Sequence, residues 1–511
     1  RSTSGDPVWI EKNLPPEGAL PEYEGRIYFG ENTTAFAIVG REPGEPPIEF
    51  DTPDANQATN TYAGTGGVPM GDWFTRVLYA AHFMDLNILL SDRVNSQSRI
   101  LYDRTPQERV SQVAPWLTLD SNIYPAVVDH RLVWIVDGYT TSRNYPNSQL
   151  VSLRSAITDA QNNPGPGADQ ALNYMRNSVK AVVDASNGTV LRRLTNDKAI
   201  AWEPEDPILQ AYGKAFPDIL KPRSEITPDL LAHLRYPEDL FRVQRQVLTR
   251  YHMTDPNAWY QQSDLWQVPA DPVASMPGQA ETTQSSAAEP PYYLSIKWPG
   301  DSSPVFSQTA VFVPYNRQNL ASYLSVVAEA TSPDYGKLRV LRMSDTQQIA
   351  GPSQTANAMT TDQKFADLLR SYLNQGSAKA RYGNLLTLPM GSGLLYVMPI
   401  YTMREGGSGS YPTLQLVAVR FGEHVGIAAT LQEALDQVFA GDAGASTGED
   451  PGTTPGGPDQ PGQPNQPGTP SGTDQQAAVT ALQKADAAFT AADAALRAGN
   501  LAEYQKQVDI A

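Results

Sequence analysis

Oxygen-bearing side chains gather most densely in residues 120–142. Asp120 precedes two apolar runs, Asp129 lies between them, and Asp137 follows them. Carboxylates combined with hydroxyl and carbonyl oxygens suit a hard cation such as Ca²⁺, so Asp120 and Asp137, which we expect near one end of a hairpin, are the candidate metal ligands. Turn and cap roles also explain all three aspartates without an ion. The oxygen ligands that would assist the pair are Ser121, Asn122 and Thr140.

Five aromatic residues fall in and around the same stretch. They are Trp116, Tyr124, Trp134, Tyr139 and Tyr145. Flat rings of this kind can form a stacking platform for a sugar, or they can fill a hydrophobic core. Core packing is favoured for Trp134, because it alternates with Val133 and Ile135 inside an apolar run.

Three hairpins are predicted to position these residues and their surroundings, each from two apolar runs around a turn. The paired runs are Arg26–Glu31 with Ala35–Val39, Ile123–Val128 with Leu132–Val136, and Ser178–Asp184 with Thr189–Leu194. Asn187-Gly188 gives the third hairpin the strongest turn signal. Apolar residues at helical spacing from Trp73 to Ile88 predict a helix that Asp72 caps.

The second half of the chain is predicted to be a mainly antiparallel sheet. Strand patterns run from Tyr292 to Ala428, with helices predicted at Lys364–Leu373 and Leu431–Phe439. The predicted fold class is therefore α+β: mainly antiparallel sheets with inserted helices.

The composition shifts along the chain predict five parts. They are an extended lead-in at 1–25, a mixed α/β subregion at 26–268, an antiparallel β-rich subregion at 291–440, a linker at 441–475 and a helical tail at 476–511. The linker contains no large apolar residue, so we expect it to be disordered. The tail repeats apolar residues at alternating spacings of four and three, which predicts a helical hairpin or, alternatively, a docking helix for a partner.

The chain is acidic and rich in turn-forming residues. It has 38 basic and 55 acidic residues, a formal net charge of −17, and 42 prolines and 38 glycines among 511 residues. Such a surface repels phosphate groups, so neither a nucleic-acid partner nor adsorption to anionic lipid is expected.

Several motifs of metal-dependent and phosphate-binding sites are missing from the sequence. The sequence contains no H-E-x-x-H, no G-x-x-x-x-G-K-[ST] and no EF-hand loop, and its five histidines are scattered. The absence of cysteine excludes thiol catalysis, iron–sulfur clusters, zinc–thiolate sites and disulfides. No cofactor is therefore expected, and Ca²⁺ is the one candidate ion.

Membrane-spanning and targeting signals are also missing from the sequence. The longest apolar stretch, Phe74–Leu90, is interrupted by Arg76, His82, Asp85 and Asn87, so it predicts a core helix. The chain opens at Arg1 without a signal peptide, and we expect further sequence upstream.

Several long strings in the sequence resemble uncharacterised protein family 0182. The strings include Gly71–Phe74, Asp92–Val94, Ser98–Arg104, Ala114–Leu117, Tyr124–Asp129, Trp134–Ser142, Arg250–Pro256, Tyr335–Leu338 and Arg26–Glu31. The resemblance covers about residues 20–440. It implies a large, mainly actinobacterial membrane protein whose N-terminal membrane helices precede a soluble region outside the cytoplasm. It implies no activity and no catalytic residues.

The leading hypothesis is an extracytoplasmic binding or interaction module held at the cell membrane. Its expected partners are the upstream membrane domain of the same protein and a cell-envelope component or a protein. The alternative is a hydrolase that acts on cell-envelope material through paired carboxylates, in which case two acidic side chains should face a cleft. A structural assembly part is a third class and predicts large exposed apolar patches.

Overall fold

The computed structural model describes residues 9–443 apart from short internal segments. These segments are 52–57, 163, 165–167, 191–198, 275, 277–286, 345–347, 374–377, 392, 405–411 and 442. The predicted linker at 441–475 and the predicted tail at 476–511 lie outside the described residues, except for Gly441 and Ala443. Among the described residues, no helix is long and apolar enough to cross a membrane.

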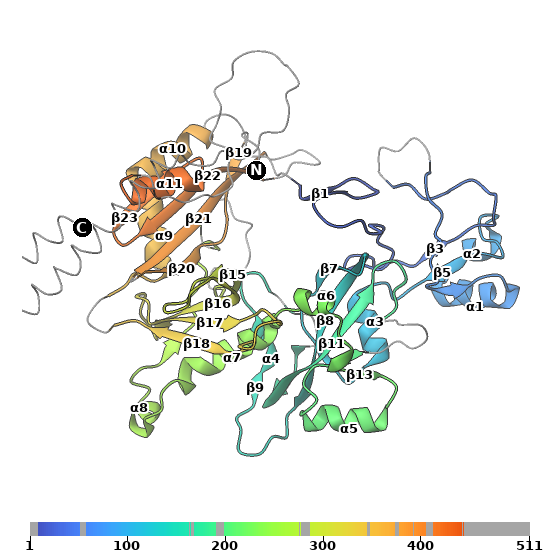
Figure 1. Ribbon diagram of the computed structural model, residues 1–511, viewed down its shortest axis with the longest axis horizontal. Coiled ribbons are helices and arrows are strands. Elements are labelled where there is room, and N and C mark those ends of the chain that lie inside the picture. Colours follow the sequence, from blue (N-terminus) through green and yellow to red (C-terminus); the bar gives the residue numbers. More distant parts are fainter. Residues whose placement is uncertain are drawn as a thin grey trace, which may run out of the picture. The chain divides into compact units, whose positions relative to one another are not determined.

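A six-stranded sheet forms the centre of the first half of the chain (Figure 1). Its order is β13-β12-β11-β8-β6, with β7 also paired to β8, and only the β12–β13 pair is parallel. The predicted hairpin at 123–136 is confirmed: Asp129 and His130 take positive φ angles of 48° and 63° in its tight turn. The strands are β6 (Thr118–Leu119), β7 (Tyr124–Val128), β8 (Arg131–Ser142), β11 (Tyr174–Asp184), β12 (Ala199–Ala201) and β13 (Leu220–Pro222).

Helices cover both faces of this sheet. On one face, Val110 of α3 (Pro106–Val113) and Leu209 of α5 (Pro207–Ala215) join a hydrophobic cluster with Val136. On the other face, Leu230 of α6 (Pro228–His233) packs in a cluster with Ile135. Because successive strand residues point to opposite faces, these neighbours in β8 serve different cores.

A smaller sheet with two helices precedes the six-stranded sheet. The sheet has the order β3-β5-β4, and the predicted helix start is confirmed, since Asp72 accepts a hydrogen bond from the amide of Thr75. The helix ends earlier than predicted, at Met84, which adopts a left-handed conformation. The elements are β3 (Ala37–Val39), β4 (Val68–Pro69), β5 (Arg99–Leu101), α1 (Trp73–Phe83) and α2 (Asn87–Leu90), and a separate pair, β1 (Glu11–Lys12) and β2 (Glu17–Gly18), lies upstream.

The predicted hairpin at 26–39 is wrong. Residues 26–31 form no strand; instead the amides of Tyr28 and Phe29 both donate to the carbonyl of Ala185, and the indole of Trp134 donates to the carbonyl of Phe29. Hydrogen bonds of its backbone therefore attach this segment to the six-stranded sheet.

The second half of the chain contains two five-stranded sheets, and the predicted α+β class is confirmed. The orders are β14-β16-β17-β18, with β15 on β16, and β19-β21-β22-β23, with β20 on β21. The strands are β14 (Trp266–Gln267), β15 (Tyr292–Ile296), β16 (Val305–Pro314), β17 (Ser322–Val327), β18 (Leu338–Arg342), β19 (Ala378–Tyr382), β20 (Leu386–Met390), β21 (Gly393–Arg404), β22 (Thr413–Phe421) and β23 (His424–Ala428). One hydrophobic cluster joins the two sheets, and α11 (Leu431–Val438) covers β22 and β23. Helices α9 (Pro352–Thr361) and α10 (Gln363–Leu373) pack into the shared cluster.

A buried helix links the two halves. Helix α7 (Glu238–Tyr251) places Leu240 and Phe241 in one cluster with Tyr139 of β8 and Phe312 of β16. The remaining short elements are β9 (Val151–Ser152), α4 (Leu153–Ile157), β10 (Ala171–Leu172), a 3-10 turn at Arg223–Glu225 and α8 (Pro256–Gln261). Because α7 belongs to both cores, its N-terminus is held close to the loop that follows β6.

Candidate functional site

The loop after β6 and the start of α7 cap each other. The carboxylate of Asp120 accepts a hydrogen bond of 3.0 Å from the amide of Asp239, and the carboxylate of Asp239 accepts one of 2.8 Å from the amide of Ser121. The N-cap residue of α7 is Pro237, which has no side chain that could perform this role. Asp120 therefore satisfies an otherwise unpaired amide in the first turn of a helix far away in sequence.

The two carboxyl groups at this junction are buried and interact. Burial, and then the neighbouring Asp137, raise the pKa of Asp120. Burial and the nearby Asp120 raise the pKa of Asp239 to about 7. The hydroxyl of Tyr139 donates to Asp120 and also accepts from the amide of Leu240. Two acidic groups that share one buried site favour retention of a proton at neutral pH.

A buried arginine compensates part of this negative charge. The guanidinium of Arg242 donates to Asp159 at 2.6 Å and to Asp239 at 3.2 Å, and it forms an ion pair with Glu238 at 2.7 Å. Its side chain is only 2 % exposed, so water screens these interactions weakly. The start of α7 is thus fixed by charge on one side and by the Asp120 loop on the other.

Asp137, the second predicted cation ligand, faces a lysine. Lys180 lies directly opposite Asp137 in the β8–β11 register, and the two form a fully buried ion pair. Burial raises the pKa of Asp137 and lowers that of Lys180, while the partner charge opposes both shifts. Lys180 also donates to the carbonyl of Arg235 at 2.9 Å and lies 5.5 Å from the centre of the Trp202 ring. The positive charge that a cation would supply beside Asp137 is therefore already present.

The side chains of the other predicted ligands form their hydrogen bonds to residues other than Asp120 and Asp137. Ser121 bonds to Asp239, Asn122 donates to Glu238, and Thr140 donates to Asp206. Asp129 lies in the hairpin turn, where its amide donates to Asp229. Within the described part of the chain, no group of three or more His, Asp or Glu residues could hold a metal ion. Ca²⁺ binding at Asp120 and Asp137 stays a prediction for calorimetric titration.

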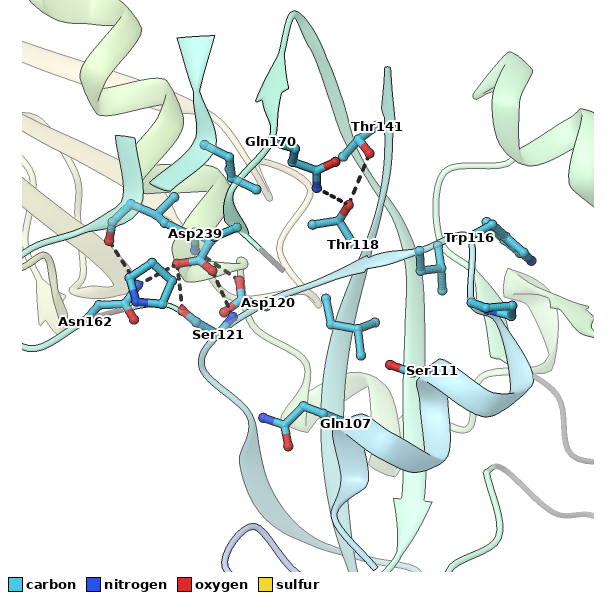
Figure 2. Close-up of a pocket in the computed structure, with 17 residues that line it drawn as sticks. Gln107, Ser111, Trp116, Thr118, Asp120, Ser121, Thr141, Asn162, Gln170 and Asp239 are labelled. Atoms are coloured by element: carbon cyan, nitrogen blue, oxygen red, sulfur yellow. Dashed lines mark hydrogen bonds between the residues drawn. The ribbon is translucent and has the colours of Figure 1, made fainter. Parts of the chain in front are cut away.

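A pocket of about 700 Å³ opens beside the capped junction. Figure 2 shows Asp120, Ser121, Asn162 and Asp239 together at one side of it. Its other polar side chains are uncharged: Gln107 and Ser111 from α3, Thr118 from β6, Thr141 from β8, and Gln170. The described residues lining the pocket include no Lys or Arg.

A second hollow of about 530 Å³ continues from this pocket. The two share Thr141 and Gln170, and Gln170 donates to Thr118, which lies 3.1 Å from the Thr141 hydroxyl. Ser142, Arg143 and Asn144 line the far part. The shared lining makes one polar groove, which we call the β6–β8 groove.

The five aromatic residues considered for a stacking platform lie in different places in the structure. Tyr124, Trp134 and Tyr139 are buried in the core. Trp116 lines the β6–β8 groove and stacks on Tyr212 with ring centres 4.1 Å apart, whereas Tyr145 stacks on Tyr174. One of the five aromatics therefore remains available to the groove.

The raised pKa of Asp239 gives a testable pH dependence. The folded protein holds this proton up to about pH 7, whereas the unfolded chain releases it near its ordinary value of about 4. The folded state then binds more protons over this interval, so stability should fall as pH rises from about 4 to 7, by up to about 1.4 kcal/mol per pH unit for one proton. Urea unfolding at a series of pH values measures this dependence. The free energy of unfolding should fall less steeply with pH in the Asp239→Asn variant than in the parent. Equal dependence on pH in both proteins would exclude this titration.

Sequence reasoning missed the residues that organise the junction. Asp239 and Arg242 lie in an amphipathic helix whose start gave no sign of a distant capping partner. Lys180 carried a usable signal, because it is the only charged residue between Val179 and Val183 in an otherwise apolar run. Such a residue in a buried strand requires an opposite charge nearby.

Comparisons with known proteins agree on one family. The model of the uncharacterised protein family UPF0182 matches residues 1–372. A UPF0182 protein of Paenarthrobacter aurescens (strain TC1) is 43% identical over 99% of this chain and 51% of its own length. One of Tropheryma whipplei (strain TW08/27) is 44% identical over 87% of this chain and 48% of its own length. The chain thus spans about half the length of these curated relatives, and no solved structure matches it. The chain belongs to the uncharacterised protein family UPF0182.

Proposed function

We propose that this chain is an extracytoplasmic binding module of a cell-membrane protein, and that the β6–β8 groove binds a neutral, polyhydroxylated component of the cell envelope. The observation that carries the proposal is the lining of the main pocket of the groove, which places uncharged amide and hydroxyl groups around the buried carboxyls of Asp120 and Asp239. The main pocket has the volume of ordinary small-molecule sites, which measure roughly 300–1,000 Å³.

The hydrogen-bonding state of the lining supports a neutral ligand. The side chain of Gln107 makes no hydrogen bond to another described residue, so its amide is available. Both carboxyl groups are already engaged. The backbone amides of Asn122 and Asp239 and the hydroxyl of Tyr139 donate to the carboxyl group of Asp120. The backbone amide of Ser121 and the side chains of Asn162 and Arg242 donate to that of Asp239. An anion would meet this buried acidic end without a basic side chain in the main pocket to offset the repulsion.

Placement at the membrane is the second part of the proposal. The resemblance of the sequence strings to family 0182 supports it. The expected partners remain an upstream membrane domain and an envelope component or protein. Relatives that are about twice as long leave room for such a domain.

Chitotriose, a neutral trisaccharide of N-acetylglucosamine, is a suitable probe for calorimetric titration. We expect Gln107→Leu to raise its dissociation constant about 3–10-fold, since one hydrogen bond to an uncharged group contributes roughly 0.5–1.5 kcal/mol. Gln112→Leu is the matched control, because Gln112 is exposed on the same helix but does not line the groove. No binding at millimolar chitotriose, equal loss in both variants, or tighter binding of anionic trigalacturonate would contradict the proposal.

A hydrolase is the second candidate, favoured by one observation. Asp239, with its pKa raised to about 7, lies beside Asp120 at one end of the pocket, and a protonated acid near a second carboxyl is the arrangement that glycosidases use. Both carboxyl groups are already engaged in hydrogen bonds within the protein, so we place this candidate below a binding function. The sequence also holds a G-x-S-x-G run at Gly444–Gly448, outside the described residues and among Gly- and Pro-rich segments that lack the apolar strand of a nucleophile elbow. Release of reducing ends from chitohexaose that Asp239→Asn abolishes would favour the hydrolase.

A further inference from the structure

Large apolar side chains are exposed on and beside helices α1 and α2. The six large side chains that form it, here called the α1–α2 face, are Trp73 (72% exposed), Phe74 (62%), Leu78 (53%), Met84 (93%), Leu86 (68%) and Leu90 (76%). Contiguous apolar surface of more than a few hundred Å² is uncommon on soluble monomers and marks interaction sites.

The fold itself does not require these side chains. Ala80 of α1 and Ile88 of α2 already fill a separate core with Met70, Val94 and Ile100. The exposed residues of α1 are consequently mostly apolar, with His82 as the one exposed polar side chain in this helix. A surface helix normally keeps a polar outer side, and one that is apolar all round is typical of a helix covered on both sides.

We propose that the α1–α2 face inserts into the interfacial layer of a lipid bilayer. Its side chains protrude: Met84 and Leu90 are more than three-quarters exposed, so no neighbouring group covers them. A deformable lipid phase accommodates such separate projections, whereas a protein partner would need a fitted pocket for each. Trp73 and Phe74 at the start of α1 are residue types found on the apolar side of helices that lie in the membrane interface.

The charges around the face show which kind of lipid contact it would make. Residues 72–93 contain Asp72, Arg76, Asp85, Asp92 and Arg93, and no lysine. Adsorption to anionic headgroups depends on clusters of four or more basic residues, which this stretch lacks. Insertion should therefore depend on apolar contact, and it should respond weakly to salt and to the content of anionic lipid.

This inference rests on the proposed placement of the chain at a membrane, and it adds which surface meets the bilayer. The test is co-flotation of the purified chain with phosphatidylcholine vesicles, and with vesicles that also contain phosphatidylglycerol, at low and high salt. We expect the parent chain to float with both kinds of vesicle. The Leu86→Gln/Leu90→Gln double variant should partition at least about tenfold more weakly.

A matched double variant controls for the loss of exposed leucines in general. Leu150 and Leu338 are exposed outside the face, at 44% and 36%, so Leu150→Gln/Leu338→Gln should float like the parent. No flotation of the parent, or equal loss in both double variants, would overturn the inference. So would a parent dimer that Leu86→Gln/Leu90→Gln converts to a monomer in sedimentation equilibrium, because a second copy would then cover the face.

The chitotriose titration separates this inference from the proposed function. The α1–α2 face shares no residue with the β6–β8 groove, so Leu86→Gln/Leu90→Gln should bind chitotriose like the parent. Flotation without chitotriose binding would support the membrane contact of the α1–α2 face and contradict ligand binding in the β6–β8 groove. Chitotriose binding without flotation would support ligand binding in the groove and contradict the membrane contact.

Discussion

Replacing Lys180 with methionine should lower the free energy of unfolding by about 3–5 kcal/mol at pH 7. The side chain of Lys180 is fully buried, and that of Asp137 is 2% exposed. Methionine nearly fills the lysine stem but removes the ammonium, so a carboxylate would remain in the core without its counter-charge. Equilibrium unfolding in urea measures the loss.

The effect of Lys180→Met should also depend on pH in a defined direction. Burial already raises the pKa of Asp137, and loss of the ammonium would raise it further. The folded variant would then hold a proton that the unfolded chain releases, so its stability deficit should shrink as pH falls toward 5 and grow as pH rises. A deficit that is independent of pH would indicate lost packing and not an unpaired charge.

Two further variants separate charge from packing. Lys337→Met removes a lysine that forms an exposed pair with Asp334, and it should cost less than about 1 kcal/mol. The double variant Lys180→Met/Asp137→Val removes both buried charges and should recover more than half of the loss, because apolar replacements of buried pairs are often well tolerated. A double variant as unstable as the single one would contradict the account.

Local signals in the sequence predicted local structure well. Asp72 caps α1 as expected, because a cap needs only the next three residues. The hairpin turn at Asp129 and His130 forms because both residues tolerate positive φ. The prediction for segment 26–31 was wrong for the opposite reason: its hydrogen-bond partner, Ala185, directly follows β11 and is distant in sequence. No pattern within residues 26–39 contains that information.

The candidate site was only partly predictable for the same physical reason. The sequence singled out Asp120 and Asp137, and the fold places them close enough for Asp137 to raise the pKa of Asp120. Their partners were missed, because Asp239 is 119 positions from Asp120 and meets it only after α7 packs between two sheets. A dense run of oxygen ligands thus indicated a polar junction, while its chemistry was decided by Lys180 and Arg242 from other elements.

Replacing Arg242 with methionine should destabilise the protein by about 3–5 kcal/mol at pH 7. Arg242 is the shared counter-charge of Asp159, Glu238 and Asp239, and its guanidinium is buried among them. Its loss would leave three acidic groups at the start of α7. Arg242→Lys keeps one charge but lacks the planar fork of donors, so it should fall between the parent and Arg242→Met.

The stability loss of Arg242→Met should depend on pH, and it should exceed the loss caused by removing an exposed arginine. Asp239 has a pKa of about 7 even with Arg242 beside it, and without the guanidinium that pKa should rise, so the stability deficit of Arg242→Met should grow as pH rises above about 7. Arg370→Met is the control, because Arg370 pairs with Asp367 on the surface of α10 and should change stability by less than about 1 kcal/mol. If Arg242→Met were no more harmful than this control, the buried cluster would not hold α7 in place. Other interactions would then have to hold Asp239 in place beside the β6–β8 groove.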